Sequence, residues 1–142
     1  MEDIKSVLSQ FNSRTKTRNE SIQKAETGPF STPSFAEIPD VFFDDVLLKF
    51  KLNRHEITLL MYLYRQVWCK PNLYKSHGIG PLNSYAELSN RLGITNEELG
   101  TCVRNLENFG LLETVRSGQY FIRKYFTEHL DIEYGQNYDE FF

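Results

Sequence analysis

Residues 84–122 read SYAELSNRLGITNEELGTCVRNLENFGLLETVRSGQYFI, and this stretch decides the fold that we expect. Capping boxes of the form S/T-x-x-E begin at Ser84 and at Thr95, so each position is predicted to start a helix. Between them, Gly93 suits the left-handed residue that ends a helix and turns the chain sharply. Apolar residues at helical spacing follow both caps. The pattern predicts a helix-turn-helix from Ser84 to Gly110.

Two β-prone runs follow this unit. They are Leu111–Arg116 and Gln119–Tyr125, and Ser117 and Gly118 lie between them. Runs of this kind joined by a turn containing glycine predict a β-hairpin. A hairpin placed directly after the second helix is a wing. The fold class that we expect is therefore mainly α with a small β-hairpin wing (α+β), a winged helix-turn-helix.

Upstream of this unit, two further helices are expected, over residues 39–50 and 53–69. Pro39 suits the first position of the earlier helix. Asn53 begins an N-x-x-E cap of the later helix, and Pro71 prevents its continuation. Residues 70–83 are expected to form a long loop, with a short extended segment at its end.

The order of these elements resembles known winged-helix proteins. Residues 38–68 read IPDVFFDDVLLKFKLNRHEITLLMYLYRQVW and precede the helix-turn-helix. Together they resemble the N-terminal domains of phage replication protein O and of DnaD-type primosome proteins, and residues 84–122 also resemble MarR-like regulators. The resemblance covers residues 38–125. It implies origin-DNA binding if the replication protein O likeness holds, and oligomerisation if the DnaD-type likeness holds.

If the second helix reads DNA, its exposed face would present Asn96, Thr101, Arg104 and Asn105 to the bases. Basic residues at the end of the first helix and around the wing would reach phosphates. The predicted DNA-binding residues are Arg91, Asn96, Thr101, Arg104, Asn105, Arg116, Arg123 and Lys124. Double-stranded DNA is the expected partner, and a homodimer is expected because one winged helix covers little DNA.

The charge distribution leaves a second function open. Residues 35–125 carry a net charge of +1, whereas residues 126–142 carry −5. Glu97 and Glu98 also lie at the start of the second helix, where they oppose phosphate. This is weak electrostatics for a DNA-binding protein. The alternative is a protein-interaction winged helix that acts as a scaffold or adaptor without binding DNA.

Both ends of the chain are candidates for binding a protein partner. Residues 1–34 are expected to form a short amphipathic helix and a flexible linker, residues 35–125 the winged-helix domain, and residues 126–142 an acidic aromatic tail. The predicted partner-binding residues are Ile4, Val7, Leu8, Phe11, Tyr138, Phe141 and Phe142. Three alternatives stay open: a helix docked on its own domain, disordered ends, and a tail folded back over the wing.

No catalytic arrangement is visible in the sequence. His55, His77 and His129 have no neighbours at ligand or dyad spacing, and Cys69 and Cys102 occur singly. We therefore expect no enzyme activity, no metal site and no cofactor, and two reduced thiols. Without a long apolar run or a secretory signal, no membrane association is expected, and the expected location is cytoplasmic.

Overall fold

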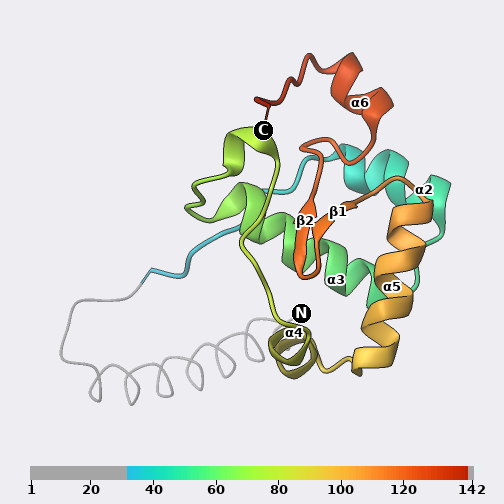
Figure 1. Ribbon diagram of the computed structural model, residues 1–142. Helices are drawn as coiled ribbons and strands as arrows, with labels where there is room; N and C mark the ends of the chain where they lie inside the picture. The colour runs from blue at the N-terminus through green and yellow to red at the C-terminus, as the bar shows by residue number, and fades with distance from the viewer. Residues whose placement is uncertain (1–31, 141–142) are drawn as a thin grey trace, which may run out of the picture. The chain divides into compact units, whose positions relative to one another are not determined.

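The computed structural model describes residues 32–140, which are mainly helical with one small antiparallel sheet (Figure 1). The α+β class is therefore as expected. The elements are the π-helix η1 (Phe42–Val46), α2 (Leu47–Phe50), α3 (Arg54–Tyr64), the π-helix η2 (Arg65–Cys69), the 3₁₀ turn η3 (Lys75–His77), α4 (Tyr85–Leu92), α5 (Asn96–Asn108), β1 (Glu113–Arg116), β2 (Gln119–Phe121) and α6 (Glu128–Glu133). Within residues 32–140, no helix is long and apolar enough to cross a membrane.

The helix expected over residues 53–69 is confirmed as α3 continued by η2. Its cap is a complete capping box. Asn53 Oδ1 accepts from the Glu56 amide at 2.8 Å, and Glu56 Oε1 accepts from the Asn53 amide at 2.9 Å. These bonds satisfy backbone donors that the first turn of a helix leaves unpaired. The cap therefore determines where α3 begins.

The caps of α4 and α5 also lie where the sequence places them. Ser84 Oγ accepts from the Glu87 amide at 3.1 Å, although the return bond of a full box is absent from the described hydrogen bonds of α4. Thr95 and Glu98 form a complete box. Between the helices, Gly93 has φ +66°, in the left-handed region that glycine adopts without strain. The chain therefore turns sharply from α4 into α5.

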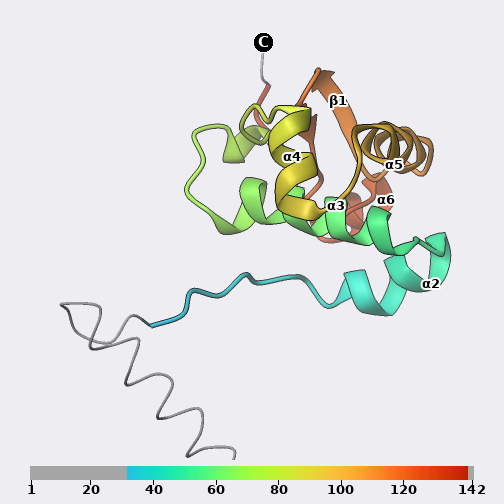
Figure 2. The same cartoon turned by 90° about the horizontal axis from the view of Figure 1, so that it is seen from below.

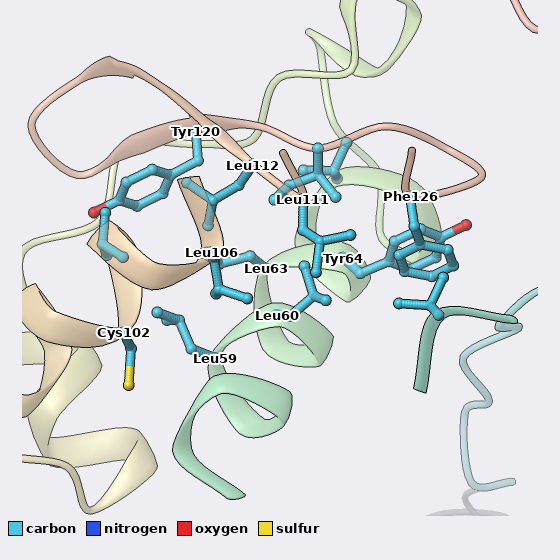
Figure 3. Close-up of a cluster of buried hydrophobic side chains, with 14 of the residues drawn as sticks. Leu59, Leu60, Leu63, Tyr64, Cys102, Leu106, Leu111, Leu112, Tyr120 and Phe126 are labelled. Atoms are coloured by element: carbon cyan, nitrogen blue, oxygen red, sulfur yellow. The ribbon is translucent and has the colours of Figure 1, made fainter. Parts of the chain in front are cut away.

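The core lies between α3, α5 and the hairpin (Figure 3). α3 contributes Leu59, Leu60 and Leu63, and Figure 3 shows Leu106 of α5 beside them. The residues that α5 buries are Leu99, Cys102, Val103 and Leu106. Leu111 and Leu112 continue this surface toward β1. Because one stripe of α5 is held in the core, its opposite side is left to solvent.

The hairpin is confirmed, and it pairs with a third segment of chain. β1 and β2 are antiparallel, with Glu113 opposite Phe121. Gly118 at the turn has φ +86°, and a Cβ there would overlap the carbonyl oxygen of Asn83. The extended segment expected at the end of the loop is displaced toward the N-terminus: Ile79 bridges Phe121. A Cβ on Gly78 would lie 2.7 Å from the Phe121 ring, so glycine allows this close approach.

Residues 126–140 pack onto the rest of the unit that begins at Phe35, so the expected boundary after Tyr125 is not a structural boundary. Phe126 is completely buried, and its ring stacks on Tyr64 with the centroids 4.7 Å apart. Burying this aromatic surface draws the following segment onto the core. Residues 1–31, 141 and 142 lie outside the described residues. The partner-binding predictions on Ile4, Val7, Leu8, Phe11, Phe141 and Phe142 therefore stay predictions.

Candidate nucleic-acid interface

α5 presents a continuous exposed side, which we call the α5 face and define by Glu97, Thr101, Arg104 and Asn108. These residues are spaced i, i+4, i+7 and i+11, so they lie on one side of the helix, opposite its buried stripe. Figure 2 looks nearly along the axis of α5 and shows β1 beside it. Within residues 32–140, Arg104 has no ion-pair or hydrogen-bond partner, so its guanidinium is available to a ligand.

The hairpin is tied to the C-terminal half of α5. The Thr114 hydroxyl of β1 donates to the Glu107 carboxylate of α5. At the other end of β1, Arg116 is exposed, and its Nε donates to Gln119 Oε1 at 3.0 Å. Because Nε is engaged, the guanidinium is held at the hairpin turn, and its terminal nitrogens form no hydrogen bond or ion pair within residues 32–140.

Arg91 and Asn96 lie on either side of the turn at Gly93. Arg91 is in the last turn of α4, Asn96 is the first residue of α5, and both are exposed. Five of the predicted DNA-binding residues are therefore exposed on α4, α5 and the hairpin. They are Arg91, Asn96, Thr101, Arg104 and Arg116.

Asn105 is engaged inside the protein. Its Nδ2 donates to Glu56 Oε2 at 2.8 Å, and Glu56 is only 4% exposed. Glu56 thus uses one carboxylate oxygen to cap α3 and the other to hold α5. Asn105 lies at the border between the exposed and buried sides of α5, and for this reason the sequence pattern predicts it as a base contact. Its amide instead fixes how α5 is rotated on α3.

Removing this amide should destabilise the fold. We expect Asn105→Ala to lower the free energy of unfolding by about 1–3 kcal/mol, because Glu56 Oε2 would lose its partner while buried. Urea denaturation measures the change. Asn108→Ala, an exposed residue of the same helix, is the control and should change stability by less than about 0.5 kcal/mol. Equal effects of the two substitutions would show that the Glu56–Asn105 bond does not hold α5.

Arg123 is directed toward the C-terminal segment, and the Lys124 ammonium lies near Trp68 of η2. Arg123 Nη1 lies 3.2 Å from Asp131 Oδ2, and Asp131 is 2% exposed. Lys124 Nζ lies 6.0 Å from the centre of the Trp68 ring. The structure therefore does not bring these two residues together with the α5 face, as the sequence prediction had grouped them, because the chain leaves β2 toward α6.

Tyr138, predicted to bind a partner, also makes internal contacts. Its hydroxyl donates to Asp131 Oδ2 at 2.6 Å and accepts from the Lys124 amide at 2.8 Å. Its ring meets the Phe121 ring edge-on at 5.0 Å. Burial raises the pKa of the Tyr138 hydroxyl far above its usual value, and the hydrogen bond to Asp131 acts in the same direction. The hydroxyl therefore remains protonated and can donate to the carboxylate.

The electrostatics of α5 are mixed. It carries Glu97, Glu98 and Glu107 but only one basic residue, Arg104. Acidic residues in the first turn stabilise the positive end of the helix dipole, and they also repel an approaching phosphate. Within residues 32–140, no cluster of His, Cys, Asp or Glu has the arrangement of a metal site. The side chains available on this surface can form hydrogen bonds and a few charge contacts.

The sequence did not reveal the roles of Glu56 and Asp131. Glu56 lies in an expected helix and Asp131 in the segment expected to be a tail, and nothing in the sequence around either one distinguishes a buried carboxylate from an exposed one. The N-x-x-E cap at Asn53 gave a partial signal, because it assigned one of the two Glu56 contacts. No protein-family model, curated protein or solved structure matches the chain.

Proposed function

We propose that residues 35–140 form a winged helix-turn-helix that binds double-stranded DNA, in replication initiation or transcription regulation. In this proposal α4 and α5 are the helix-turn-helix, α5 is the recognition helix, and β1 and β2 are the wing. The observation that carries the proposal is the orientation of α5: it buries one stripe in the core and leaves Thr101, Arg104 and Asn108 exposed beside the hairpin.

Four of the exposed residues suit DNA contacts by their chemistry. Arg104 can donate to two acceptors of guanine, and Thr101 can contact a thymine methyl group in the major groove. Arg91 and Arg116, from the neighbouring elements, suit phosphate contacts that position the protein without reading sequence. A homodimer would place two such helices about 34–36 Å apart, one turn of DNA, and would double the surface for recognition.

A mobility-shift titration tests this function. We expect the full chain to bind mixed-sequence duplex DNA more weakly as salt rises, because lysine and arginine release counterions from phosphates. On a selected site, Arg104→Ala should weaken binding by about 1–3 kcal/mol. The charge-matched control is Lys70→Ala, which removes an exposed positive charge after η2, away from α5. It should change affinity much less.

Two outcomes would contradict the proposal. One is an absence of duplex binding by the wild type at low salt, and the other is an equal loss of affinity in the two variants. Glu97→Gln provides a test of opposite sign. Removing this carboxylate from the α5 face should strengthen duplex binding because it removes a repulsion of phosphate.

A second candidate function is protein binding through the same face, as a scaffold or adaptor. It is favoured by the acidic residues of α5, which outnumber its single basic residue. In that case, neither the wild type nor Glu97→Gln would bind duplex DNA at any salt concentration. The two functions therefore give different results in one titration.

A further inference from the structure

A second candidate site lies away from the α5 face, at the opposite end of α3. A pocket of about 510 Å³ is lined by Trp68 at the end of η2, by Phe35 and Glu37 of the segment before η1, and by Lys75 and Lys124. Cavities of this size accommodate small ligands. The Cys69 thiol donates to the Glu37 carbonyl at 3.4 Å, which ties the two sides of the pocket together.

This pocket is distinct from the proposed duplex-binding surface. α3 and η2 form one helical run, with Glu56 contacting α5 near its start and Trp68 lining the pocket near its end. Twelve residues of helix separate these positions, which corresponds to about 18 Å along the axis. A ligand in the pocket would therefore not contact the α5 face.

The charges of the pocket favour an anion. Lys75 and Lys124 both line it, and within residues 32–140 neither forms an ion pair. Glu37 is the one acidic residue among the residues that line it. Two ammonium groups against one carboxylate leave an excess of positive charge at the site.

The walls of the pocket favour a flat aromatic group. Trp68 is half-buried, and Phe35 is 83% exposed, so both rings have surface left to contact a ligand. Trp68 is held in place because its Nε1 donates to the Ile122 carbonyl at 3.0 Å. Nucleobases stack on aromatic side chains of this kind in a way that tolerates any base.

We propose that this pocket binds a nucleotide, with its base against Trp68 and Phe35 and its phosphate between Lys75 and Lys124. A phosphate alone would make no use of the rings, and a neutral aromatic compound would make no use of the two lysines. A nucleotide uses both, and lysine is a common phosphate ligand. A free nucleotide and a single-stranded nucleic acid share this chemistry. The proposal does not depend on duplex binding by α5.

Fluorescence of Trp68 provides a direct test, because the full chain contains one tryptophan. We expect adenosine monophosphate to change the fluorescence saturably, and adenosine or inorganic phosphate alone to bind more weakly. Lys75→Gln and Lys124→Gln should each weaken nucleotide binding about tenfold, because each removes a charge-assisted contact to phosphate. Glu37→Gln should strengthen binding, because it removes a negative charge.

The control is Lys49→Gln, which removes a lysine of α2 that does not line this pocket and should leave nucleotide affinity unchanged. Circular dichroism checks that all the variants fold. A single-stranded oligonucleotide is the ligand if it binds more tightly than the mononucleotide and depends on the same two lysines. If the oligonucleotide and the mononucleotide bind with equal affinity, the free nucleotide is the ligand.

The proposal is overturned if neither adenosine monophosphate nor the single-stranded oligonucleotide changes the Trp68 fluorescence at millimolar concentration. It is also overturned if the two pocket variants bind as tightly as the Lys49 variant. Arg104→Ala separates this site from the duplex site, because it should leave mononucleotide binding unchanged. Failure of duplex binding and failure of nucleotide binding are therefore distinguishable.

Discussion

Phe126→Ala is expected to lower the free energy of unfolding by about 3–5 kcal/mol, the usual cost of truncating a buried phenylalanine. Phe126 has no exposed surface. Its ring stacks on Tyr64 and lies 5.1 Å from the ring of Phe42, so truncation would leave a cavity between α3 and η1. Because whole domains are stable by only about 5–15 kcal/mol, a loss of this size should be clear in urea denaturation followed by Trp68 fluorescence.

The matched control lies in the same C-terminal segment. Ile132 of α6 is 72% exposed, and Ile132→Ala should change stability by less than about 0.5 kcal/mol. If Phe126→Ala does not fold at all, Phe126→Leu keeps the position apolar and should show a smaller loss that can be measured. A variant of Phe126 as stable as the wild type would contradict the packing of residues 126–140 on the core. A chain ending at Tyr125 would lose this ring as well.

Asp131→Ala is expected to destabilise the protein by about 3 kcal/mol, the lower end of the range for removing one partner of a buried ion pair. The Asp131 carboxylate accepts from Arg123, from the Tyr138 hydroxyl and from the Tyr125 amide. Without it, all three donors lose their acceptor. The lower end of the range applies because the Arg123 side chain is partly exposed and water can solvate it.

Glu133→Ala is the control for charge, because it also removes one carboxylate from α6. Glu133 is exposed and lies 3.9 Å from His129 in a surface pair, so its removal should cost less than about 1 kcal/mol. A double-mutant cycle with Arg123→Ala measures the Arg123–Asp131 coupling directly. Additive losses in that cycle would show that the two side chains do not stabilise each other.

Local signals predicted α3, α4, α5 and the hairpin well, whereas α6 lies in residues 126–142, which were expected to be a tail. The caps at Asn53, Ser84 and Thr95, and the turn at Gly93, act on neighbouring residues, so the one-dimensional pattern carries them. The apolar stripe of α5 was predicted for the same reason. Its buried residues are the ones that the helical period selects.

Partners that are distant in the sequence could not be predicted in this way. Asn105 finds Glu56 across 49 residues, and Tyr64 donates to the Lys124 carbonyl across 60. A polar residue at the edge of a helical stripe looks the same in sequence whether it faces solvent or a carboxylate on another helix. The acidic and aromatic composition of residues 126–142 predicted a tail, because the sequence does not show that Phe126 and Asp131 contact distant residues.

The sequence by itself determined where α3, α4 and α5 begin, where α4 turns into α5, and which side of α5 is buried. These follow from caps, glycine and helical period, which act within a few residues. Only the tertiary structure decided which polar side chains remain available to a ligand. It engages Asn105, Arg123 and Tyr138 in internal contacts and leaves Arg104 exposed. The reason is that a buried carboxylate must be satisfied by whichever donors the packing of distant segments brings within reach.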